Sequence, residues 1–117
     1  MPYGRPREEH DPRFPLPPVP TLNLLASNVP RVLTVLAGRY EDPFLYGSLA
    51  RGEAVAGSDI DIAATAVESL DPYWDRRLSL ELSWLLGHPV DLIRWDRMSP
   101  EHRATAERDA LPLHCLG

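Results

Sequence analysis

The chain has 117 residues, a formal net charge of −5 and a hydrophobic fraction of 44%. This length fits one folded domain with one small core. The acidic balance argues against binding along a nucleic-acid duplex, which needs a basic surface. There is no apolar run of the roughly 18 residues that a membrane span needs, no apolar stretch typical of a signal peptide, and Cys115 is the only cysteine. We therefore expect a soluble cytoplasmic protein without an internal disulfide, a membrane contact or a direct nucleic-acid partner.

Prolines are concentrated at the N-terminus, where residues 1–20 hold seven of the thirteen in the chain. Proline has a fixed φ and no N–H group, so this segment cannot form a helix or a central strand. We predict a proline-rich extended arm over residues 1–20, largely of polyproline II type or disordered, and a folded domain over residues 21–117. The apolar and proline residues 16–20 also fit a ligand for an aromatic groove, but a plain extension is the favoured interpretation.

Beyond residue 20 the hydrophobic pattern predicts a helix, two strands, a helix, a strand and a final helix. Residues 22–25 are predicted to form a short turn, with Pro30 early in a separate helix that ends at Gly38. The other elements expected are strands at residues 43–46, 58–65 and 89–95, a helical turn at 49–52, a helix over 71–87, a helix from 99 and a tail over 111–116. This order predicts an α/β fold with a small mixed sheet and flanking helices.

A Gly47-Ser48 step follows the first predicted strand and precedes the predicted helical turn. Backbone N–H groups in such a turn point outward, and together with the serine hydroxyl they suit phosphate oxygens. Glycine allows the backbone to close on a ligand because it has no Cβ. Since Gly-Ser is also a common turn signal, the two residues alone favour a plain turn over a phosphate site.

Asp59 and Asp61 are separated by one residue in the second predicted strand. Side chains alternate across a strand, so both carboxylates should lie on one face, roughly 7 Å apart, with Ile60 and Ile62 on the other. Like charges at this separation repel unless a cation lies between them. Hard oxygen ligands favour magnesium over zinc or iron. A solvated strand end explains the pair equally well.

Asp91 interrupts an otherwise apolar run in the third predicted strand. A carboxylate in such a run is expected at a strand end or facing a ligand. If this strand pairs beside the second one, Asp91 joins Asp59 and Asp61 on one surface. Three acidic groups near a phosphate cradle are the ingredients of two-metal phosphoryl or nucleotidyl transfer.

The spacing of these motifs resembles a known family. Gly47-Ser48, ten further residues and then Asp59-Ile60-Asp61 match the GS-x10-D-x-D signature of the DNA polymerase β-like nucleotidyltransferase superfamily. The stretch GSLARGEAVAGSDIDI is similar to the minimal nucleotidyltransferase subgroup, and Asp91 falls where the third carboxylate of that family lies. The resemblance covers roughly residues 23–113 and implies the nucleotidyltransferase, or polymerase β palm-like, fold.

The resemblance also implies a role for each carboxylate. Asp59 and Asp61 are expected to ligate two magnesium ions. Asp91 is expected to bind the catalytic ion and to help take the proton from the attacking hydroxyl. In the family, that hydroxyl attacks the α-phosphorus in line, and pyrophosphate leaves. This chemistry agrees with the general need to stabilise charge on both the attacking and the leaving oxygen.

The nucleotide contacts implied by the resemblance lie in the Gly-Ser turn. Ser48 and the Gly47 turn are expected to hold the β- and γ-phosphates of ATP. Arg51 is expected to brace the triphosphate, with pairing to Glu53 at the surface as the alternative. Three histidines lack metal-ligand spacing and are predicted to lie at the surface: His88, His102 and His114.

The acceptor of the transfer follows from the family rather than from any residue. Larger relatives hold their substrates with a second, helical domain, for which 117 residues leave no room. Minimal members of this kind typically act as antitoxins that transfer AMP to a tyrosine of a HEPN-type toxin, which implies a protein adenylyltransferase with ATP as donor. Two alternatives are a non-catalytic antitoxin that masks its partner and a small-molecule, aminoglycoside-type nucleotidyltransferase acting as a homodimer. Apolar surface left by the missing domain predicts a partner or self-association.

Overall fold

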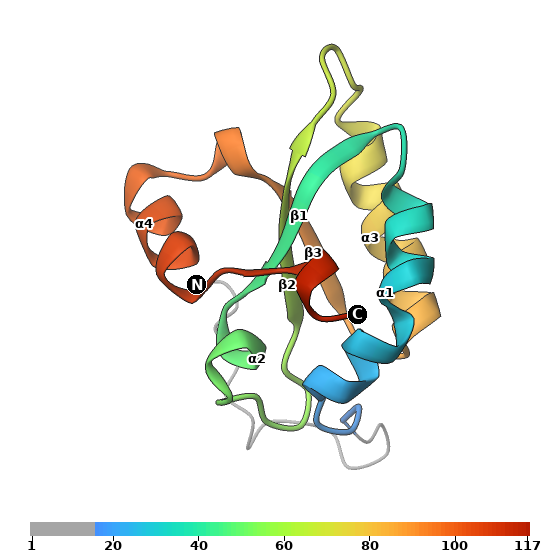
Figure 1. Cartoon of the computed structure of the whole chain (residues 1–117), viewed down its shortest axis with the longest axis vertical. Coiled ribbons are helices and arrows are strands. Elements are labelled where there is room, and N and C mark those ends of the chain that lie inside the picture. The colour runs from blue at the N-terminus through green and yellow to red at the C-terminus, as the bar shows by residue number, and fades with distance from the viewer. Residues whose placement is uncertain (1–15) are drawn as a thin grey trace.

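One four-stranded sheet with helices on both faces forms the body of the molecule (Figure 1). The structure is a computed structural model and describes residues 16–117; most of the arm predicted over residues 1–20 therefore lies outside the described residues. The strands are β1 (Tyr40–Tyr46), β2 (Ile60–Ala66), β3 (Val90–Arg94) and β4 (Leu111–Pro112). The helices are α1 (Leu22–Leu36), α2 (Ser48–Arg51), α3 (Tyr73–Leu86) and α4 (Pro100–Asp109), with 3-10 turns at Trp95–Arg97 and Leu113–Cys115.

The sheet is mixed, with the strand order β3-β2-β1-β4. β1 runs antiparallel to both β2 and β4, whereas β2 and β3 are parallel. The parallel pair is joined through α3, because two parallel neighbours need a long crossover connection. Helices α1 and α3 cover one face of the sheet, and α4 lies on the other side (Figure 1). This arrangement confirms the predicted fold class.

The main core lies between the sheet and the helix pair α1 and α3. Ile60 and Ile62 of β2 point into it and have no exposed surface. They pack with apolar residues of both helices, among them Leu25, Leu78 and Leu82, which are at most 1% exposed. Burial of each such side chain contributes about 1.5 to 3 kcal/mol. The alternation of β2 therefore places its isoleucines in the core and frees its other face.

The N-terminal helix differs from its prediction. Residues 22–36 form one continuous helix with Pro30 inside it, instead of a turn followed by a separate helix. The Oγ1 of Thr21 caps it by accepting a hydrogen bond from the Leu24 N–H at 3.0 Å. The helix buries four apolar side chains on one stripe: Leu25, Val29, Val32 and Leu36. That burial outweighs the roughly 3 kcal/mol that an interior proline costs.

The outer edge of β3 is closed by two serines of α3. The N–H groups of Val90 and Leu92 donate to Oγ of Ser83 and Ser79, at 2.9 and 3.0 Å. Edge strands with free N–H groups invite pairing with another chain, so these bonds protect the edge. They also fix α3 beside β3. Asp91 lies in β3 between the two residues that donate these bonds, so the same bonds help to fix its position.

The last residues of the predicted arm contact the domain. The N–H of Gly57 donates to the carbonyl of Pro17 at 3.1 Å, and Pro20 is among the fully buried side chains. The domain boundary at residue 21 stays a prediction. Within the described part of the chain, none of the helices is both long and apolar enough to span a membrane.

Candidate active site

The candidate site lies on the sheet face opposite the main core, where β1 ends and β2 and β3 begin. In the strand register Asp61 of β2 lies between Tyr46 of β1 and Asp91 of β3. Directly opposed residues on neighbouring strands share one face of the sheet. The parallel pairing of β2 with β3 thus brings together two carboxylates that are thirty positions apart in the sequence (91 minus 61).

Asp59 completes the acidic group from the loop directly before β2. Its charge raises the pKa of both Asp61 and Asp91, so it lies close to each of them. Asp59 and Asp61 also line an open cavity of about 470 Å³ together with Ser48 and Arg51. The structure therefore collects the predicted phosphate-binding and carboxylate residues around one cavity, with Asp91 beside it.

Gly47 is the residue that allows this close arrangement. It has φ +82°, a conformation that side chains rarely adopt, and it lies directly before α2. A Cβ at this position would overlap Oδ2 of Asp61. The turn then closes on itself, because the N–H of Arg51 donates to the Gly47 carbonyl at 3.1 Å. A glycine is thus required here for two separate reasons, backbone conformation and contact with the carboxylate.

The carboxylates repel one another across a partly buried surface. Burial raises the pKa of Asp61 to about 7, and Asp59 and Asp91 add to the shift while Arg51 opposes it. Burial and Asp59 also raise the pKa of Asp91, whereas His102 lowers it. A shift of this sign means that the negative charge at the site lacks sufficient compensation within the protein.

This charge distribution suits a magnesium ion bound jointly with phosphate. Within residues 16–117, no three acidic, histidine or cysteine side chains surround a single point that an ion would occupy. The carboxylates therefore do not form a complete protein cage. Magnesium in nucleotide sites is usually held by one or two carboxylates plus substrate phosphates. Asp59 and Asp61 line the cavity in which those phosphates would lie, so the donor set fits the ion.

Arg51 is fixed by two carboxylates at the mouth of the cavity. Its Nε donates to Oε1 of Glu53 at 2.9 Å and its Nη1 donates to Oδ2 of Asp109 at 2.8 Å. The Asp109 side chain is only 6% exposed and comes from the end of α4. The predicted pairing of Arg51 with Glu53 is present, while its side chain still lines the cavity. The sequence offered no signal for Asp109, because the two residues are 58 positions apart.

One of the three histidines differs from its predicted surface position. His88 is only 7% exposed, because the adjacent Pro89 carbonyl accepts a hydrogen bond from Ile60 and draws this segment into the sheet. The prediction of a surface histidine was wrong there. The ring of His102 on α4 lies edge-on to the ring of Tyr46, with centroids 5.6 Å apart. His102 is thus a wall of the site while it stays exposed as predicted, and His114 is exposed as predicted too.

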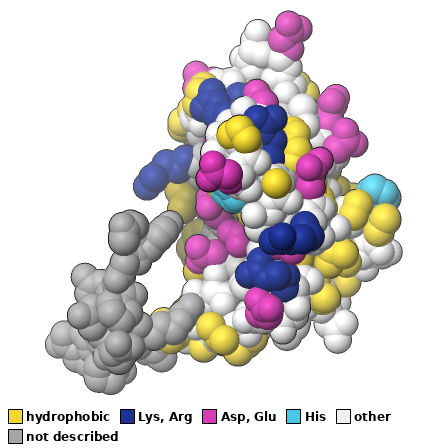
Figure 2. Space-filling model, turned by 90° about the vertical axis from the view of Figure 1, so that its left-hand side faces the viewer, with side chains coloured by type: hydrophobic (Ala, Val, Ile, Leu, Met, Phe, Trp, Pro, Cys, Tyr) yellow, Lys and Arg dark blue, Asp and Glu magenta, His cyan; other side chains and the backbone are white. Residues whose placement is uncertain are grey.

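On the side of the molecule that carries α4, acidic and basic side chains alternate over the surface (Figure 2).

Beneath α4 a second, smaller apolar cluster contains Tyr46, Ala63, Met98 and Ala106. Tyr46 thus belongs both to this cluster and to the site, and burial followed by the charges of Asp61 and Asp91 raises its pKa. The site is built against α4 instead of lying on an open strand end.

Comparison with known proteins identifies the arrangement. Residues 41–113 match the family model described as polymerase beta, nucleotidyltransferase. The chain belongs to the polymerase beta nucleotidyltransferase family. The matched segment contains the whole site, from the Gly47 turn to Asp109, and this nucleotidyltransferase has the fold that the motif spacing predicted. A search of curated proteins found no match.

Several solved structures share the fold of this nucleotidyltransferase. One, assigned as a minimal nucleotidyltransferase, is 32% identical with a TM-score of 0.70, covering 79% of this chain and 95% of the other. A toxin–antitoxin complex with AMP-PNP is 25% identical with a TM-score of 0.66, covering 75% and 71%. A complex of a tri-AMPylated Shewanella oneidensis HEPN toxin with its MNT antitoxin is 22% identical, with a TM-score of 0.61 and coverage of 80% and 71%. At that identity the last likeness concerns the fold alone.

Proposed function

We propose that this nucleotidyltransferase transfers AMP from ATP to a hydroxyl group of a protein partner, and that the acceptor is a tyrosine of a HEPN-type toxin. The observation that carries the transfer is the contact of the Gly47 turn with Asp61, beside the cavity lined by Ser48 and Asp59. The similar toxin–antitoxin complexes, one with AMP-PNP and one with a tri-AMPylated toxin, support the donor and the acceptor. On this proposal the chain is the antitoxin of its pair.

The nucleotide would lie with its phosphates over the start of α2. Ser48 begins this helix and lines the cavity, so its N–H and hydroxyl are available to the β- and γ-phosphates. Arg51, held by Glu53 and Asp109, presents its remaining N–H donors to the same anion. Because the two carboxylates fix the guanidinium, little side-chain entropy is lost when ATP binds.

Asp59, Asp61 and Asp91 would hold two magnesium ions. Bound magnesium lowers the charge on the phosphates and stabilises both the attacking and the leaving oxygen. Asp91 takes the proton from the acceptor hydroxyl, whose oxygen forms a bond to the α-phosphorus. The bond from that phosphorus to the bridging oxygen breaks, and pyrophosphate leaves.

The test is intact mass spectrometry of the protein encoded beside this chain after incubation with the chain, ATP and magnesium. A gain of roughly 329 Da per group, the mass of one AMP unit, is expected for the partner. The Asp59→Ala/Asp61→Ala variant should give no gain under the same conditions. A partner that forms a stable complex but gains no mass would contradict the transfer and favour an antitoxin that acts by masking.

A further inference from the structure

The outer side of the helix pair α1 and α3 exposes large apolar side chains. Trp84, in the last turn of α3, is 87% exposed, and Leu80 one turn earlier is 54% exposed. Both lie outside the main core, which the same helix contacts through Leu78 and Leu82. An exposed tryptophan next to an exposed leucine is typical of a surface that binds another protein.

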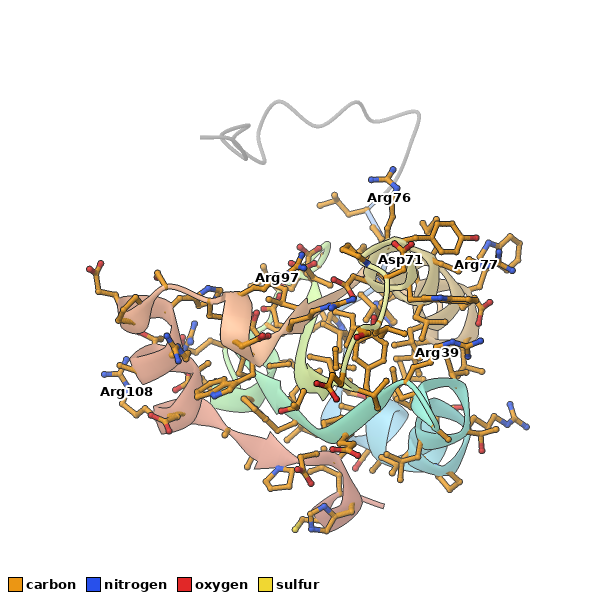
Figure 3. The ribbon with its side chains drawn as sticks, turned by 90° about the horizontal axis from the view of Figure 1, so that it is seen from above. Arg39, Asp71, Arg76, Arg77, Arg97 and Arg108 are labelled. Atoms are coloured by element: carbon orange, nitrogen blue, oxygen red, sulfur yellow. The ribbon has the colours of Figure 1, made fainter. Side chains whose placement is uncertain are left out.

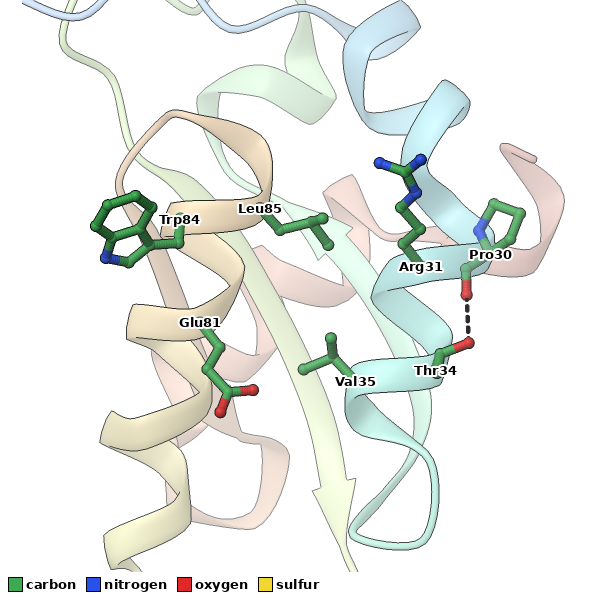
Figure 4. Close-up of a pocket in the computed structure, with 7 residues that line it drawn as sticks. All are labelled: Pro30, Arg31, Thr34, Val35, Glu81, Trp84 and Leu85. Carbon is green, nitrogen blue, oxygen red and sulfur yellow. Dashed lines mark hydrogen bonds between the residues drawn. The ribbon is translucent and has the colours of Figure 1, made fainter.

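A groove of about 600 Å³ runs between the two helices beside Trp84 (Figure 4). Val35 of α1 and Leu85 of α3 point toward one another across the gap and form its apolar floor (Figure 4). Trp84 stands at the outer edge of α3, directed away from α1. One surface therefore carries both an apolar projection and an apolar groove.

The two sides of the groove carry opposite charges. Arg31 of α1 lines one side of the groove, and Glu81 of α3 lines the opposite side (Figure 4). Among residues 16–117, Arg31 forms no ion pair, whereas Glu81 accepts a hydrogen bond from Arg77 of its own helix at 3.1 Å. A second molecule bound here gains affinity if it presents an anion to Arg31 and a cation to Glu81.

We propose that a second copy of this chain binds this groove and forms a two-fold symmetric dimer, with Trp84 of each copy packed in the groove of the other. A symmetric dimer requires one surface that complements itself. The adjacent projection and groove meet that requirement. The same two-fold rotation that places α1 of one copy against α3 of the other brings Arg31 to Glu81 twice. The groove lies across the sheet from the carboxylates, so the dimer leaves both active sites open.

The expected interface is small. Each tryptophan contributes on the order of 200 Å², and with Leu80 and the groove walls the total reaches about 1,000 to 1,400 Å². This is the lower end of the range for stable dimers, so the dissociation constant should be micromolar. The monomer therefore coexists with the dimer at low concentration.

Sedimentation velocity of the full chain between about 1 and 200 μM measures this equilibrium. The average molecular mass in solution should rise from that of the monomer to that of the dimer over this concentration range. Trp84→Ala should remain monomeric, whereas Tyr73→Ala, which removes another exposed aromatic of α3, should dimerise as the unaltered chain does. Circular dichroism should show the same fold for both, because both side chains are mainly exposed. A monomer throughout the range, or an unchanged Trp84→Ala dimer, would overturn the proposal.

Charge reversal tests the two-fold geometry itself. Arg31→Glu and Glu81→Arg should each weaken dimerisation about 10-fold or more, because each places like charges together twice. An equimolar mixture of the two variants should dimerise again, since both contacts then join opposite charges. Glu107→Arg and Arg108→Glu reverse exposed charges on α4, on the far side of the sheet (Figure 3), and should have no effect. A mixture no tighter than its components would overturn the two-fold arrangement.

Discussion

The two faces of the sheet differ in what their side chains do. Toward α1 and α3, Ile60 and Ile62 of β2 lie in a continuous aliphatic core with no exposed surface. Toward α4, Asp61 of the same strand lies between a tyrosine and a second aspartate, next to a much smaller apolar cluster. Consecutive residues of one strand thus serve stability on one side and form the candidate active site on the other.

This difference shows how the fold tolerates a site that destabilises it. The pKa of Asp61 is raised to about 7, so at neutral pH the folded protein carries a charge that the environment disfavours. The core on the opposite face stabilises the strand and offsets this repulsion. A cation between the carboxylates would remove the conflict. Variants on each face should therefore have opposite effects on stability and activity.

The largest expected effect is the loss of transfer when the carboxylates of the site lose their charge. Asp59→Asn/Asp61→Asn should reduce AMP transfer at least ~1,000-fold, because the variant no longer holds the cations that stabilise the transition state. Thermal unfolding should show a fold at least as stable as the original. Glu41→Gln, at the far end of β1, is the matched control and should keep full activity. Substantial residual transfer would show that the carboxylates are not the metal ligands.

Substitutions on the core face of the sheet should lower the stability of the protein. Ile62→Ala should lower the free energy of unfolding by about 2 to 5 kcal/mol, since it leaves a cavity among fully buried neighbours. Ile62→Val should cost only about 0.5 to 1.5 kcal/mol and keep transfer activity while folded. Urea denaturation measures both. If Ile62→Val abolished transfer without loss of stability, the separation of the two faces would be wrong.

Gly47→Ala should lower both the stability of the fold and the transfer activity, because Gly47 places the turn in contact with the Asp61 carboxylate. We expect a loss of about 1 to 3 kcal/mol in stability and at least ~100-fold in transfer, since the new Cβ displaces Asp61. Gly38→Ala is a close control. Gly38 has the same φ of +82°, but a Cβ there meets no atom within 4 Å. It should lose about 1 kcal/mol and no activity; equal effects of the two substitutions on transfer would contradict the proposed contact.

A smaller effect is a pH-dependent gain in stability from Asp61→Asn without divalent metal. The pKa of Asp61 is about 7 in the folded protein and exceeds that in the unfolded chain. Its contribution to the free energy of unfolding is therefore complete below about pH 4 and is lost as pH rises through 7. The variant lacks this loss, so its free energy of unfolding should exceed that of the original by roughly 2 to 4 kcal/mol at pH 8, with little difference near pH 4. Thermal unfolding at several pH values measures the difference. Magnesium should stabilise only the original chain, and an equal response of both would contradict the charge repulsion.

Local patterns in the sequence account for much of this structure. The spacing of Gly47-Ser48 and Asp59-Ile60-Asp61 identified the family, and the alternation of β2 predicted which side chains face the core. Helix α3 and the three longer strands were also expected near their observed positions. These features depend on backbone periodicity over a few residues, which the sequence expresses directly.

Other features depend on contacts between distant segments, and only the folded chain reveals them. The continuous helix through Pro30 exists because the sheet buries one of its sides, and His88 is buried because its segment pairs with β2. The link between Arg51 and Asp109, and the apolar groove beside Trp84, likewise arise from segments that no local pattern relates. Local spacing thus determines which residues are able to carry the chemistry. Long-range packing decides which of them meet, because the free energy of burial is gained only when separate elements come together.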